Sequence, residues 1–153
     1  MKKILFLLCV LAVTNVTFAQ ERAKKTEVII VKEGVKFKLD SKTKAITEVV
    51  IAKFKCTQGL GCKELMTLSL KKPLIFTAND VKPERFKEEE NFSKGEISGI
   101  ITVGKNKYKA DLLFFTRVSK DKKVTFNGSI VIEGSSFKST KGRAVTIDVK
   151  AIQ

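Results

Sequence analysis

The clearest pattern in the chain is a regular alternation of apolar and polar residues through its second half. Apolar side chains recur at every second position in four runs, residues 97–103, 108–116, 124–132 and 145–151. A period of two indicates strands that bury one face. Turn-forming sequences at 104–106 and 119–122 join successive runs. Strands joined by turns this short predict an antiparallel meander.

The first half carries the same pattern less regularly. Its runs are residues 35–39, 46–54, 65–70 and 74–77, with Pro73 interrupting the pattern before the last of them. The segment Asn79–Gly95 differs, because it holds a proline and the acidic run Glu88–Glu90. We interpret it as the longest connection in the chain, in part helical.

About eight strands in one small domain predict an all-β fold. Long twisted strands in that number close into an antiparallel, lipocalin-like barrel or pack as a β-sandwich, and we favour the barrel. A small eight-stranded barrel either fills its interior with side chains or holds one ligand. The pattern alone leaves both possibilities open.

The N-terminus has the three-part layout of a secretory signal peptide. Two lysines precede an apolar run, Ile4–Val13, and small residues lead to Ala19. We predict that residues 1–19 are removed and that residues 20–153 form a single periplasmic or secreted domain. The apolar run is too short to cross a bilayer, and no later run is longer, so we expect no stable membrane span.

Charge adds a second constraint on function. Removal of Lys2 and Lys3 lowers the formal net charge from +14 to +12. A strongly basic exported protein favours anionic partners such as acidic glycans, lipopolysaccharide or phospholipid headgroups, and export argues against nucleic acid. The alternative interpretation is that the lysines only solvate the outer faces of strands and protect sheet edges.

Two cysteines remain after processing, Cys56 and Cys62, and two glycines lie between them. In an oxidising compartment a close pair most simply forms a disulfide. The chain has no histidine, which removes the commonest general base and the commonest metal ligand. We therefore predict a structural disulfide, no metal, no cofactor and no enzymatic activity.

Two segments of the chain, Val35–Ile46 and Gly95–Gly104 with Tyr108–Thr116, have strand patterns that are shared with a known family. They are similar to the opening strand and the central hairpin of the YceI-like family of periplasmic lipid-binding proteins. Val124–Phe137 takes the place of the strand before the last, although Glu133–Phe137 lacks the family's arginine and aspartate. The resemblance implies a lipocalin-like barrel whose apolar lumen takes an isoprenoid or fatty-acyl chain.

Three functions follow as hypotheses. The first is a binding protein that holds an apolar, chain-like lipid in a barrel lumen. Its candidate ligand-binding residues are Phe37, Leu39, Ile101, Tyr108, Leu112, Phe114, Phe126 and Ile130. The second is a basic interaction module that docks on an anionic envelope polymer or an acidic partner. The third is a structural domain with a solid core.

Overall fold

The computed structural model describes residues 26–43, 45–56, 58–89 and 91–153, and for Thr26 and residues 80–89 it describes the backbone alone. The predicted signal peptide, residues 1–19, lies outside the described residues. The strands are β1 (Thr26–Val31), β2 (Val35–Leu39), β3 (Ile46–Ile51), β4 (Leu74–Glu89), β5 (Phe92–Val103), β6 (Asn106–Val118), β7 (Val124–Ile132) and β8 (Ala144–Ile152). The helix α2 (Leu60–Ser69) follows β3, and the short 3-10 turn η1 (Gly134–Ser136) precedes β8.

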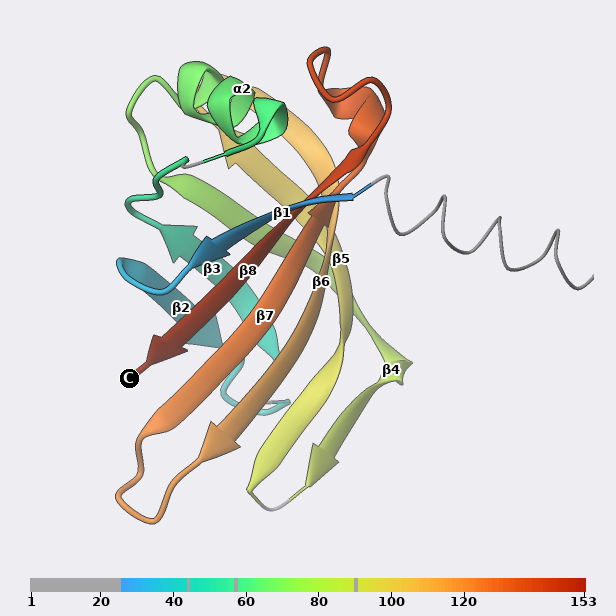
Figure 1. The fold of residues 1–153 in the computed structure, drawn as a ribbon. Coiled ribbons are helices and arrows are strands. Elements are labelled where there is room, and N and C mark those ends of the chain that lie inside the picture. The colour runs from blue at the N-terminus through green and yellow to red at the C-terminus, as the bar shows by residue number, and fades with distance from the viewer. Residues whose placement is uncertain (1–25, 44, 57, 90) are drawn as a thin grey trace, which may run out of the picture.

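All eight strands belong to one sheet, in the order β1-β8-β7-β6-β5-β4-β3-β2. The pairs from β2 to β8 are antiparallel, as the short turns predict, and β1 joins the edge of β8 in parallel. The sheet curls into a half-barrel, and α2 covers one end of it (Figure 1). The all-β, barrel-like prediction is confirmed, and the sheet order leaves β1 and β2 as two edges that are not paired with each other.

The apolar face of each alternating run forms the interior. Ile97, Ile101, Leu112, Phe126 and Ile130 are each no more than 1% exposed. Their neighbours along the strands face outward, as at Leu113 and Phe115. The predicted inward faces of the second half are therefore confirmed.

Two segments differ from the sequence-based prediction. Leu65–Leu70, grouped with the strands, lies almost wholly in α2. Asn79–Gly95, interpreted as a connection, continues β4 to Glu89 and starts β5 at Phe92. Pro83 lies where the β4–β5 register shifts, between Val81 and Phe86. A proline fits there because it has no backbone N–H to donate to a regular ladder.

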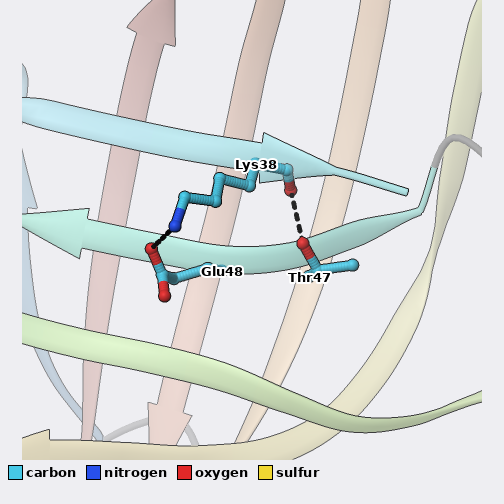
Figure 2. A network of polar contacts seen from close by, with 3 residues as sticks. All are labelled: Lys38, Thr47 and Glu48. Atoms are coloured by element: carbon cyan, nitrogen blue, oxygen red, sulfur yellow. Dashed lines mark hydrogen bonds and ion pairs between the residues drawn. The ribbon is translucent and has the colours of Figure 1, made fainter. Parts of the chain in front are cut away.

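Lysines line the outer side of edge strand β2. The Lys38 ammonium lies 2.9 Å from the Glu48 carboxylate on β3, and the Thr47 hydroxyl donates to the Lys38 carbonyl oxygen at 3.3 Å (Figure 2). The Lys38 side chain is 71% exposed, so such a pair contributes about 0–1 kcal/mol. Its role fits edge protection, since charged side chains discourage pairing with another chain.

Candidate functional site

The structure places all eight predicted ligand-binding residues on the inner side of the sheet. Phe37, Ile101, Leu112, Phe114, Phe126 and Ile130 are buried, and Leu39 and Tyr108 are half-buried against the same core. The rings of Phe37 and Phe126 lie 5.0 Å apart, which joins β2 to β7 across the interior. The rings of Tyr108 and Phe137 pack together with their centroids 5.7 Å apart. These residues pack together, and their role as ligand contacts stays a prediction.

An open hollow lies beside this interior, on the side where the edge strands β1 and β2 are not paired with each other. We call it the seam cleft. Its volume is about 760 Å³, and it separates β1 from the segment that leads from β3 to α2. It is lined by Val28, Ile29, Ile30, Val31, Lys32, Glu33, Gly34, Lys53, Phe54, Lys55, Cys56, Gln58 and Cys62. Its size falls within the range of small-molecule sites in proteins.

The seam cleft combines an apolar floor with a cationic mouth. Ile29 and Val31 point inward and are each 4% exposed, and Phe54 packs against the core from the opposite wall. The side chains of Lys32, Lys53 and Lys55 are exposed at the rim. Glu33 is the acidic residue among the lining side chains. The arrangement suits a ligand that has an apolar chain and an anionic end.

A carboxylate on β1 connects this strand to the start of α2, which carries Cys62 of the cleft lining. The Glu27 side chain accepts hydrogen bonds from the backbone N–H of Gly61 at 3.0 Å and of Cys62 at 2.9 Å. These are first-turn amides of α2, which have no partner within the helix. The negative charge also faces the positive end of the helix dipole. Glu27 thus ties edge strand β1 to α2 although the two are distant in sequence.

The cysteine pair also attaches the N-terminal end of α2, because Cys62 lies in its first turn. Cys56 and Cys62 lie at disulfide-bonding distance, with their Cα atoms 5.6 Å apart, in agreement with the predicted pair. Both line the seam cleft. Gly61 fits closely here, because a Cβ at this position would lie 2.7 Å from a Val145 methyl carbon on β8. The start of α2 is therefore fixed to both β1 and β8.

Replacement of Glu27 by glutamine should destabilise the protein by about 1–3 kcal/mol, because two charge-assisted hydrogen bonds are weakened and the helix loses a favourable charge. Urea unfolding followed by circular dichroism measures this difference. Glu33→Gln is the matched control, since Glu33 is exposed in the turn after β1, and it should change stability by less than about 0.5 kcal/mol. Equal effects of the two variants would contradict the assigned role of Glu27.

A second hollow lies on the outer face of the sheet. We call it the outer groove. Its volume is about 850 Å³, and it crosses β5, β6, β7, β8 and β1. It is lined by Ile30, Val31, Lys32, Lys94, Gly95, Glu96, Leu113, Phe114, Phe115, Asn127, Gly128, Ser129, Asp148, Val149 and Lys150. Phe114 is the one predicted ligand-binding residue among them.

Two carboxyl groups of the described residues have lowered pKa values, and hydrogen bonds are the main cause of both. At Glu64 on α2, hydrogen bonding from Ser139 lowers the pKa of the carboxyl. At Asp40, the backbone amides of Thr43 and Lys42 hold the pKa of the carboxyl below its usual value. Those hydrogen bonds shape the turn between β2 and β3. Among the described residues, no cluster of histidine, cysteine and acidic side chains has the arrangement of a metal site. Within the same residues, no helix is long and apolar enough to cross a bilayer.

No family model, no curated protein and no solved structure matches this chain. The resemblance to the YceI-like family therefore stays a prediction.

Sequence reasoning identified the interior but missed both hollows. The seam cleft depends on β1, whose parallel pairing with β8 joins the two ends of the domain. No local pattern encodes that contact. One available signal was the run Val28–Val31, in which apolar residues occupy consecutive positions and are not confined to one face. In the structure Ile29 and Val31 are buried, while Val28 and Ile30 are exposed and line the cleft.

Proposed function

We propose that this chain is an exported, non-enzymatic binding protein for an apolar, chain-like ligand of the fatty-acyl or isoprenoid class. The observation that carries the proposal is the seam cleft, a hollow of about 760 Å³ that combines apolar side chains of β1 and Phe54 with three lysines. Each buried methylene of a ligand chain would contribute about 0.8 kcal/mol. The rim lysines would favour a carboxylate or phosphate head group.

The same proposal gives the predicted interior residues a role. Phe37, Leu112 and Phe126 belong to the same buried cluster as Ile29 and Val31, which also line the cleft. A ligand chain would lie against the exposed side chains of Val28 and Ile30 and against Phe54, without having to displace the packed rings. The paired cysteines support residence in an oxidising compartment, the periplasm or the extracellular space.

The test is uptake of a dansyl-labelled fatty acid by the purified mature protein, together with native mass spectrometry of the protein as isolated. We expect saturable binding with a blue-shifted emission, and a bound lipid mass in the isolated protein. The variant Lys53→Glu/Lys55→Glu should weaken binding of the fatty acid about tenfold, which corresponds to about 1.4 kcal/mol. Binding of a dansyl-labelled fatty alcohol should change by less than about twofold, because it carries no charge for the lysines to attract.

Lys36→Glu/Lys107→Glu is the matched control, because it changes the net charge equally at exposed positions away from the cleft. It should leave both affinities within about twofold of the original protein. A protein without bound lipid that also fails to take up either probe would refute the proposal. Equal losses in the two charge-reversal variants would refute the role of the cleft lysines.

A further inference from the structure

The outer groove presents side chains that the core does not use. On β5 to β8 its outward residues alternate with buried ones, so their side chains are directed away from the interior. Two rows of neighbouring residues cross these four strands. One row is Lys94, Phe115, Asn127 and Lys150, and the other is Glu96, Leu113, Ser129 and Asp148. The groove is therefore lined by outward side chains of the sheet, and it shares only residues of β1 with the seam cleft.

Apolar and aromatic surface is exposed at its centre. Leu113 is 50% exposed and Phe115 is 38% exposed, although both lie in the middle of a long strand. The ring of Phe115 stacks against Phe92 with centroids 5.7 Å apart, so the aromatic platform is held in place. Large apolar side chains grouped on an otherwise charged face mark interaction sites.

Lysines stand on both sides of this platform. Lys94 on β5 and Lys150 on β8 are exposed in the same row, three strand spacings or roughly 14 Å apart. Within the described side chains, neither lysine forms an ion pair. The nearby Asp148 carboxylate accepts a hydrogen bond from the Ser129 hydroxyl at 2.6 Å. Two cations at this separation match an extended ligand with repeated negative charges better than a single small anion.

The strand pairing and the polar side chains of the groove restrict which extended anionic ligand can bind there. Strands β5 to β8 are each paired on both sides, so no strand edge is available there for an added peptide strand. Asn127 and Ser129 offer polar groups beside the aromatic ring. Ring faces that stack on Phe115, hydroxyls that hydrogen-bond to these side chains, and carboxylates that reach the lysines all occur together in an acidic polysaccharide.

We propose that the outer groove binds a segment of an acidic polysaccharide, laid across β5 to β8, with Phe115 as the stacking platform and Lys94 and Lys150 as carboxylate partners. This second ligand site goes beyond the lipid-binding function and does not depend on it.

The experiment measures binding of fluorescently labelled oligogalacturonate to the mature protein by anisotropy, with maltooligosaccharide as the neutral probe. We expect saturable binding of the acidic oligomer that weakens steeply with salt, because exposed charges are screened beyond about 8–10 Å near physiological ionic strength. Lys94→Gln/Lys150→Gln should weaken it about tenfold, and Phe115→Ala at least about threefold. Circular dichroism verifies that each variant is folded, and Phe115→Leu replaces Phe115→Ala if that variant is not.

Lys36→Gln/Lys107→Gln removes the same charge outside the groove and should cost less than twofold. Equal losses in the two lysine pairs would overturn the proposal, because only net charge would then matter. Binding of polyglutamate as tight as binding of the acidic oligosaccharide would overturn it in favour of a general polyanion surface. Full binding by the folded Phe115 variant would also overturn it, since no stacking platform would be needed.

Discussion

Replacement of Leu112 by alanine is expected to lower the free energy of unfolding by about 2–5 kcal/mol, the range for a leucine truncated in a packed core. Leu112 has no exposed surface and lies between Ile97 and Ile130 in the sheet. Its packing is close enough that a Cβ on Gly128 would lie 3.0 Å from a Leu112 methyl carbon and 2.6 Å from the Phe126 ring. Chemical denaturation with two probes measures the change.

Leu113→Ala is the matched control for this prediction. Leu113 is the next residue on the same strand, has the same side chain and is 50% exposed on the outer face. Its truncation should change stability by less than about 0.5 kcal/mol. A Leu112 variant that loses less than about 1 kcal/mol would show that the residue lines an open lumen, and would move the ligand from the seam cleft into the half-barrel itself.

The fold was predictable where apolar alternation is long and uninterrupted. Strands β5 to β8 are each nine residues or longer, and the short turns after β5 and β6 fix the register of two of their pairs locally. A slip by one residue would expose an entire apolar face, so the pattern determines both the pairing and the inward residues. Ile101, Phe126 and Ile147 are all in the core for this reason.

The helix was not predicted because its sequence fits both the two-residue period of a strand and the longer period of a helix. Met66, Leu68 and Leu70 alternate with polar residues, as in a strand, while Cys62 and Leu65 share a helical face. Burial of both Cys62 and Leu65 shows that the helical period prevails. The deciding contacts are tertiary, since Glu27 and the Cys56–Cys62 pair fix the first turn of α2.

The number of strands in the described residues agrees with the prediction, but the set of segments that form them differs from the predicted set. Leu65–Leu70 was predicted as a strand and is helical, whereas β1 is a strand that was not predicted. The pairing of β1 with β8 joins segments that begin at Thr26 and Ala144, a separation that no turn signal spans. The seam cleft exists only because of this pairing, so the apolar core could be predicted from sequence and the open site beside it could not.

Removal of the cysteine pair is the second large expected effect. In the chain-entropy description, a cross-link that closes the loop from Cys56 to Cys62 stabilises the folded state by about 2–2.5 kcal/mol. Cys56→Ala/Cys62→Ala should lose that amount in urea unfolding. Because Cys62 is 1% exposed, alanine is the better replacement, since serine would bury a hydroxyl. The original protein in excess reductant should match the double variant to within about 0.5 kcal/mol.

The same variant separates global stability from the integrity of the cleft. The pair connects the cleft wall at Cys56 to the first turn of α2, where Glu27 also binds. Without the cross-link, this end of the helix should open more readily than the central strands, because local opening follows the weakest set of contacts. Amide hydrogen exchange should then accelerate in residues 58–64 while β6 and β7 stay protected, and affinity for the dansyl-labelled fatty acid should fall under conditions where the protein is still folded. Uniform acceleration across the sheet would mean that the pair acts on the unfolded chain alone and that the cleft wall does not depend on it.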